Sequence, residues 1–190
     1  MRRAGPLEYS NRMDKQKPTV KDLELAIRNV PDFPKPGIQF KDITPLLADA
    51  RLFAGAVDLL AEGHAPGSVD AVVGIDARGF IFAAAVALKL RAGFVPVRKK
   101  GKLPYRTHEE NYDLEYGSNT IAIHTDSVQP GSRVLLIDDL LATGGTSAAA
   151  IALLRKLGVN LLEARFLIEL NFLNGRARLK GLPVHSLIVY

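Results

Sequence analysis

One segment constrains the fold of this chain more than any other: an apolar run that ends in two acids and a glycine-rich loop. Residues 134–137 are β-branched or aliphatic without alternation, which is typical of a strand buried on both faces. Residues 147–157 carry apolar side chains at helical spacing and precede Gly158, so they predict a helix. The loop between the two elements therefore lies at the carboxyl end of a parallel strand, where open α/β sheets bind their ligands.

This loop, Ala142-Thr143-Gly144-Gly145-Thr146, has the chemistry of a phosphate site and is called the phosphate loop below. Its glycines leave backbone N–H groups accessible, the helix N-terminus adds unpaired donors, and the threonine hydroxyls add more. Asp138 and Asp139 precede it, and adjacent carboxylates at a strand end are unfavourable unless they hold something. Ribose hydroxyls, with Mg²⁺ nearby, are natural partners, so the segment indicates a site for a phosphorylated sugar.

Other phosphate-binding motifs fit this chain less well. A Walker A loop needs a lysine after its last glycine, and none follows Gly145. The dinucleotide fingerprint Gly-x-Gly-x-x-Gly is also missing from the start of the helix. Gly74 and Gly79 have Walker-like spacing, but Phe80 stands at the lysine position.

The rest of the chain alternates between predicted helices and strands. Helices are expected over 20–29, 51–62, 80–90 and 147–157, and strands over 71–75, 94–97, 121–123, 134–137 and 164–170, with 186–190 at an edge. This alternation predicts an α/β fold with a central, mostly parallel sheet flanked by helices. With 190 residues, 47% of them hydrophobic, we expect one domain over 20–190 behind a flexible tail, 1–19.

Composition narrows the function classes. The net charge of +5 and the pI near 9.5 fit an anionic ligand, and would also fit weak nucleic-acid binding. No nucleic-acid module, membrane-spanning stretch or secretory signal is recognisable, so we expect neither a nucleic-acid nor a membrane partner. The absence of cysteine excludes disulfides and is compatible with the cytoplasm, the expected location. The four histidines show no metal-ligand spacing.

The segment 134–146 resembles the phosphoribosyl-pyrophosphate (PRPP) motif of type I phosphoribosyltransferases, and the resemblance extends over about 20–190. It implies their fold, with a small N-terminal hood and a flexible catalytic lid loop. It implies Mg²⁺ held mainly by PRPP, with no metal site made of side chains alone. The residues implied to bind the ribose and phosphate of PRPP or AMP are Asp138, Asp139, Ala142, Thr143, Gly144, Gly145 and Thr146.

Residues 74–80 follow another buried strand and precede another helix, so they predict a second anion site at the same edge of the sheet. Arg78 could grip a pyrophosphate with its fork of donors. In the family this is the pyrophosphate loop, which often carries a cis peptide bond, here Asp76–Ala77. Ala77 stands where a serine is common and is expected to act through its backbone. The resemblance implies pyrophosphate binding by Asp76, Ala77 and Arg78, and a catalytic role for Arg78.

The basic loop Arg98-Lys99-Lys100-Gly101-Lys102-Leu103-Pro104 would by itself be a solvated surface loop. It also matches a motif of adenine phosphoribosyltransferases. In that family the arginine and lysines reach pyrophosphate, partly across a dimer interface. The match implies this role for Arg98, Lys99 and Lys102, and it implies a homodimer.

Residues 99–119 form a long polar excursion, which in a compact domain is usually functional or disordered. The family closes this segment as a lid loop that excludes water. Leu114-Glu115-Tyr116-Gly117 matches the family's motif there. The resemblance implies that Glu115 is catalytic, handling the proton of the base, and that Tyr116 belongs to the lid.

The proline-rich segment 31–46 is open to two interpretations. It is a loop that covers the core with Phe33 and Phe40 buried, or it is the adenine-binding hood of adenine phosphoribosyltransferases. In the hood, Phe40 stacks on the purine and the backbone of Gln39 and Lys41 reads its edge, beside Ile38. Gln39 replaces a common aliphatic residue.

Base choice has one more sequence determinant. Ala142 stands where relatives that use 6-oxopurines typically have an aspartate. The resemblance therefore implies conversion of adenine and PRPP to AMP and pyrophosphate. The alternatives are a phosphoribosyltransferase for another base, a regulator that senses PRPP or nucleotide on the same fold and, last, nonspecific RNA binding through the basic excess.

Overall fold

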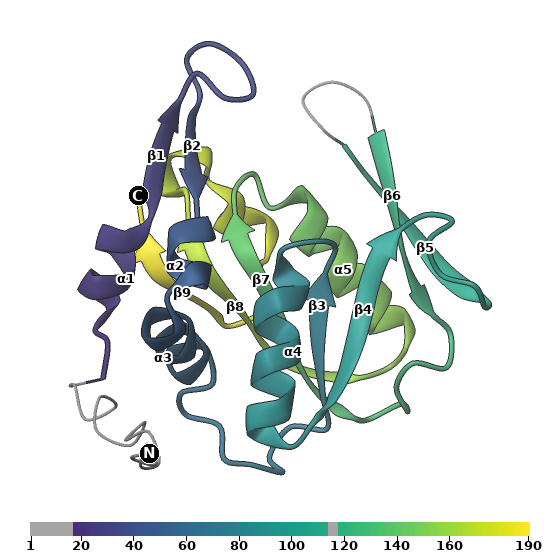
Figure 1. Cartoon of the computed structure of the whole chain (residues 1–190). Coiled ribbons are helices and arrows are strands. Elements are labelled where there is room, and N and C mark those ends of the chain that lie inside the picture. The colour runs from purple at the N-terminus through teal and green to yellow at the C-terminus, as the bar shows by residue number, and fades with distance from the viewer. Residues whose placement is uncertain (1–16, 114–117) are drawn as a thin grey trace, which may run out of the picture. The chain divides into compact units, whose positions relative to one another are not determined.

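The computed structural model describes residues 17–113 and 118–190, which form two compact units, one ending at Gly55 and the other comprising 56–190 (Figure 1). Residues 1–16 of the expected tail lie outside the described residues. In the described part of the chain, no helix is long and apolar enough to cross a membrane. The expectation of a single domain over 20–190 stays a prediction.

The first unit is a β-hairpin between short helices. Its elements are α1 (Val20–Ala26), β1 (Arg28–Pro31), β2 (Gln39–Asp42), α2 (Thr44–Ala48) and the start of α3 (Ala50–Leu60). Thr19 and Asp22 form a capping box at the N-terminus of α1. The helix expected over 20–29 is three residues too long, because the backbone turns extended at Ile27 and continues into β1.

The hairpin also revises the interpretation of 31–46 as a loop. Val30 of β1 pairs with Phe40 of β2, and the Phe33 and Phe40 rings make an edge-to-face contact with centroids 5.1 Å apart. Phe33 is 51% exposed, so it is no core residue. Much of the proposed hood is therefore regular structure that presents an aromatic pair.

The second unit is built on a seven-stranded sheet of order β5-β6-β4-β3-β7-β8-β9. The strands are β3 (Ala71–Ile75), β4 (Gly93–Lys99), β5 (Thr107–Asp113), β6 (Ser118–His124), β7 (Arg133–Leu141), β8 (Asn160–Glu169) and β9 (Val184–Val189). The five strands that lie next to one another in the order β4-β3-β7-β8-β9 run parallel. Strand β6 is antiparallel to both of its neighbours, β4 and β5. This confirms the α/β, mostly parallel sheet.

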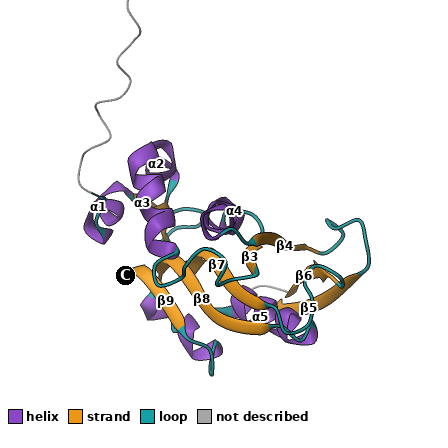
Figure 2. Ribbon diagram, turned by 90° about the horizontal axis from the view of Figure 1, so that it is seen from below, coloured by secondary structure: helices purple, strands orange, loops and turns teal. Residues whose placement is uncertain are grey.

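Two helices cover this sheet from opposite sides (Figure 2). They are α4 (Gly79–Leu90) and α5 (Gly145–Lys156), and the 3₁₀ turns η1 (Asn171–Leu173) and η2 (Gly175–Arg178) follow β8. All five residues of β3 are buried, and so are most of β7, which explains their continuous apolar sequence. The carboxyl ends of β3 and β7 lie side by side and lead into α4 and α5.

The excursion expected over 99–119 is irregular over 100–106, but residues 107–113 and 118–119 belong to strands. Strand β5 pairs with β6 in a hairpin whose register runs from Thr107–His124 to Asp113–Ser118. Pairing through the backbone does not require apolar side chains, and charged residues are common on edge strands. The glutamates of β5 form ion pairs with lysines: the carboxylate of Glu109 lies 2.7 Å from Nζ of Lys100, and that of Glu110 lies 2.6 Å from Nζ of Lys156.

Candidate functional site

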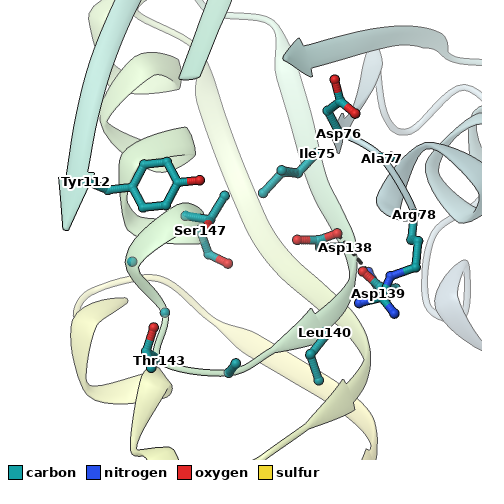
Figure 3. A pocket seen from close by; sticks show the side chains of 14 residues that line it. Ile75, Asp76, Ala77, Arg78, Tyr112, Asp138, Asp139, Leu140, Thr143 and Ser147 are labelled. Atoms are coloured by element: carbon teal, nitrogen blue, oxygen red, sulfur yellow. Dashed lines mark hydrogen bonds and ion pairs between the residues drawn. The ribbon is translucent and has the colours of Figure 1, made fainter. Parts of the chain in front are cut away.

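A cavity of about 320 Å³ opens in the second unit at the carboxyl ends of β3 and β7 (Figure 3). Its lining comes from residues 75–78, from residues 138–147 without Leu141, and from Tyr112. Both segments that the sequence marks as anion sites thus meet in one cavity. The sequence-predicted residues that line it are Asp76, Ala77, Arg78, Asp138, Asp139, Ala142, Thr143, Gly144, Gly145 and Thr146.

The phosphate loop begins after Leu141 and passes directly into α5. Gly144 is the N-cap of α5 with φ of 78°, a left-handed conformation that glycine adopts without strain. The helix begins at Gly145, two residues before the predicted start, so Gly145 and Thr146 belong to its first turn. The N–H groups of a first turn have no partner within the helix and are available to an anion.

Asp138 and Asp139 lie in β7 with only 8% and 6% of their surface exposed. Burial and the adjacent charge of Asp139 raise the pKa of Asp138 well above its ordinary value. Burial also raises the pKa of Asp139, against the opposing effect of the Arg78 guanidinium. The backbone N–H of Asp139 donates to Oδ1 of Asp138 at 2.9 Å. Two buried, adjacent carboxylates are unfavourable without a partner. The pair is therefore suited to accept hydrogen bonds from a ligand's hydroxyls or to bind a cation.

The pyrophosphate loop connects β3 to α4. The Asp76–Ala77 peptide bond is cis, as the resemblance implies. Nε of Arg78 lies 2.8 Å from Oδ2 of Asp139, which joins this loop to the end of β7. At Gly79, an added Cβ would lie 2.4 Å from Oδ1 of Asp138, so the start of α4 packs directly on this carboxylate.

The basic loop approaches the pyrophosphate loop from β4. Nε of Arg98 donates to Oδ2 of Asp76 at 3.1 Å, and Nη1 of Arg98 donates to the carbonyl of Lys102 at 3.2 Å. Arg98 therefore links the basic loop to Asp76. The side chains of Arg98, Lys99 and Lys102 do not belong to the cavity lining in the part of the chain that is described.

The remaining predicted site residues lie elsewhere. Residues 38–41 belong to the hairpin of the first unit, where Ile38 is 42% exposed and Nζ of Lys41 donates to Oδ1 of Asn29 at 2.8 Å. Glu115 and Tyr116 lie outside the described residues. Their roles stay predictions.

Sequence reasoning assigned no role to two polar side chains of the cavity. Tyr112 of β5 and Ser147 of α5 both line it (Figure 3). Tyr112 is recognisable only once the β5–β6 hairpin is known, because the strand places alternate side chains on opposite faces. Ser147 follows directly after the phosphate loop and could have been included by its position in the first turn of the helix.

The cavity's donor set fits Mg²⁺ bound together with a phosphorylated ligand. Mg²⁺ usually binds through one or two carboxylates plus substrate phosphates and keeps several waters. Asp138 and Asp139 offer such carboxylates. Among residues 17–113 and 118–190, no group of three or more histidine or acidic side chains could hold a metal ion by itself.

Comparison with known proteins gives a consistent result. A model of the phosphoribosyl transferase domain matches residues 41–175. Adenine phosphoribosyltransferase of Chloroflexus aurantiacus is 55% identical over 172 residues, which cover 90% of this chain and 99% of the relative. The enzyme of that name from Acidothermus cellulolyticus is 58% identical over 162 residues, covering 85% and 92%.

Solved structures agree. Adenine phosphoribosyltransferase from Rhodothermus marinus has a TM-score of 0.85 at 51% identity, covering 90% of this chain and 98% of that one. The Saccharomyces cerevisiae enzyme, solved with an imino-altritol bisphosphate and adenine, has a TM-score of 0.84 at 41% identity, covering 88% and 97%. The chain therefore belongs to the phosphoribosyltransferase family and, within it, to the adenine phosphoribosyltransferases.

Proposed function

We propose that this protein is a purine-salvage enzyme that converts adenine and PRPP to AMP and pyrophosphate. The observation that carries the proposal is the convergence of two anion loops, after β3 and β7, on one cavity with a buried acid pair between them. The first turn of α5 fits a 5′-phosphate, and Arg78 fits a pyrophosphate. The names of relatives at 53–58% identity support adenine as the base.

The reaction breaks the bond between C1′ of the ribose and the pyrophosphate oxygen and forms a bond from C1′ to N9 of adenine. In the proposal, the phosphate loop fixes the 5′ end and so holds C1′ in line for attack. Asp138 and Asp139 accept hydrogen bonds from the ribose hydroxyls and face the positive charge that develops at C1′. Arg78, Arg98, Lys99 and Lys102 stabilise the leaving pyrophosphate, and Glu115 receives the N9 proton.

Mg²⁺ is part of this proposal. It would enter with PRPP and lie near Asp138 and Asp139. When bound, it supplies positive charge that neutralises the leaving pyrophosphate.

We further propose that residues 38–41 bind adenine. The aromatic pair of Phe33 and Phe40 offers a ring for stacking on the base, and the backbone of Gln39 and Lys41 would read its edge. Ala142 would exclude 6-oxopurines because it offers no carboxylate to their N7 side.

A homodimer is proposed on the character of α4. Ile81, Ala85 and Leu88 follow the spacing of one helical face, and Ile81 is 39% and Leu88 82% exposed. An exposed apolar face of this kind is suited to burial against a second copy. The cytoplasm remains the proposed location.

The test offers the purified protein PRPP and Mg²⁺ with adenine, hypoxanthine, guanine or xanthine in separate reactions, and follows nucleotides by chromatography. AMP formed from adenine alone is the expected result. Product from another base would overturn the specificity and keep the reaction. PRPP binding without any product would favour the sensing regulator. The double variant D138N/D139N serves as the control, since it should bind and turn over PRPP poorly.

A further inference from the structure

A turn that lies outside the cavity lining packs against the backbone of the phosphate loop. Gly175, the first residue of η2, is so close that an added Cβ would lie 2.1 Å from the carbonyl oxygen of Ala142 and 2.9 Å from the backbone nitrogen of Gly144. In the other direction, a Cβ on Gly144 would lie 2.3 Å from the carbonyl oxygen of Gly175. Neither position has room for a side chain, so backbone lies directly on backbone.

The side chain next to Gly175 fixes this turn to the sheet. Nε of Arg176 donates to Oε1 of Glu169 at 3.0 Å, and Nη2 binds the other carboxylate oxygen. Nη1 of Arg176 donates to the carbonyl of Val184 at 2.7 Å. Glu169, the last residue of β8, is only 3% exposed and also accepts from Oγ of Ser186 at 2.6 Å. Three elements, β8, η2 and β9, are thereby joined at one buried carboxylate.

The phosphate loop needs such a support. Its predicted ligand contacts come from backbone N–H groups, whose directions depend on the path of the chain rather than on a side-chain rotamer. Two consecutive glycines allow that path many alternatives. A misplacement of about 1 Å in a site of this kind costs on the order of 100-fold in rate.

We propose that η2 is a backstop for the phosphate loop, with Gly175, Arg176 and Glu169 as positioning residues that set the affinity for the 5′-phosphate. The inference rests on the proposed function, in that the loop is taken to bind the phosphate of PRPP. None of the three residues lines the cavity. Their action is confined to one half of the site, because Asp76 and Arg78 belong to the pyrophosphate loop after β3.

This confinement provides the test. Dissociation constants for ribose 5-phosphate and for magnesium pyrophosphate are measured by calorimetry on the wild type, G175A, R176Q and R176K, with thermal melts of each. G175A and R176Q should weaken ribose 5-phosphate roughly 10-fold or more and leave pyrophosphate within about twofold. R176K keeps the charge beside Glu169 without the two-pronged contact and should fall in between.

Two control variants match these changes elsewhere. G93A adds the same methyl group in β4, 3.6 Å from the carbonyl of Asp70, with ordinary contact. R133Q breaks a similar two-pronged pair, in which Arg133 contacts Asp70 at 3.1 and 2.6 Å. Both controls should leave the two affinities within about twofold of wild type.

The outcomes separate the inference from the proposed function. Ribose 5-phosphate affinity unchanged in G175A and R176K, or both ligands weakened equally, would overturn the backstop. Wild type that binds ribose 5-phosphate but forms no AMP would overturn the catalytic function alone. Wild type that fails to bind ribose 5-phosphate would overturn the phosphate loop and the backstop with it. If G175A or R176Q does not fold, R176K still decides.

Discussion

The guanidinium of Arg78 contacts the carboxylate of Asp139, with 2.8 Å between Nε and Oδ2, and so couples the pyrophosphate loop to the end of β7. The pair is asymmetric: the side chain of Arg78 is 38% exposed and that of Asp139 only 8%. Burial raises the pKa of Asp139, and Arg78 acts against that rise. The arginine proposed for pyrophosphate therefore also lowers the pKa of an acid that is proposed to accept the ribose hydroxyls.

Replacement of Arg78 should reveal this double role. In R78A the pKa of Asp139 should rise further, because burial then acts without an opposing cation. We expect kcat/KM to fall by about 100-fold or more, and its acidic limb to move to higher pH, as for loss of a charged transition-state contact. The measurement is kcat/KM for PRPP against pH. An acidic limb that stays in place would contradict the coupling, and R155A on the exposed surface of α5 is the control.

Replacement of Asp138 by asparagine should abolish activity and raise the stability of the fold. Its pKa is raised in the folded state by burial and by Asp139, so folding becomes less favourable as pH rises from the unfolded value of 3.8 to the folded one. D138N removes that penalty, and an asparagine oxygen can still accept from the N–H of Asp139. The variant should be inactive yet melt higher at pH 7.5, by about 2–4 °C for each kcal/mol gained.

The pH dependence of the gain in Tm distinguishes this explanation from a general stabilisation. The advantage of D138N should shrink at pH 4, where the wild-type carboxyl holds its proton in the folded state. An equal change in Tm at both pH values would contradict the assignment. D126N alters an exposed turn and should show no such dependence.

Strands buried on both faces were predictable from sequence, and the exposed or polar strands of the two hairpins were not. Strands β3 and β7 have continuous apolar runs because parallel neighbours and helices enclose them, so the runs mark where the strands lie, although β7 extends beyond the expected 134–137 at both ends. Strand β5 is polar except for Tyr112, and nothing in its own sequence indicates that it pairs with β6. Pro31 is similar: it is the last residue of β1, but a proline is more typical of a loop than of a strand.

The site follows the same rule. The phosphate and pyrophosphate loops were predictable because each follows a buried strand and precedes a helix, a local pattern. Tyr112 depends on the register of a hairpin, and Gly175 on backbone packing between segments 31 residues apart in sequence, since it contacts Gly144. Such relationships have no local signature in a single sequence.

Glu115 is the residue on which the proposed proton transfer depends. E115Q keeps the shape and most hydrogen-bonding capacity of the side chain and removes its basicity. Turnover with adenine should fall by about 10²–10⁴-fold, the usual contribution of a general base, with PRPP affinity nearly unchanged. Single-turnover kinetics separate the two quantities. Turnover equal to wild type would remove Glu115 from the chemistry, and E110Q on β5 provides a matched control.

Glu163 should contribute to the stability of the protein and have no effect on the reaction. It is 7% exposed and contacts His64, Arg165 and His185, with Nε2 of His185 3.0 Å from Oε2. Burial raises its pKa, but the hydrogen bonds from His64 and Arg165 outweigh burial and leave the pKa below its ordinary value of 4.5. Its contribution to stability is therefore present above pH 4.5 and lost as pH falls through the folded pKa.

E163Q should accordingly destabilise the protein by about 2–4 kcal/mol at pH 7, because the side chain of Arg165, only 12% exposed, is left beside a neutral partner. The deficit should diminish at pH 4, where the wild type begins to lose the same charge. Urea unfolding at the two pH values measures this, and KM for PRPP should stay unchanged because Glu163 lies outside the cavity lining. E109Q, which disturbs only an exposed pair, should cost less than about 1 kcal/mol. A pH-independent deficit would show that packing rather than charge gives Glu163 its effect.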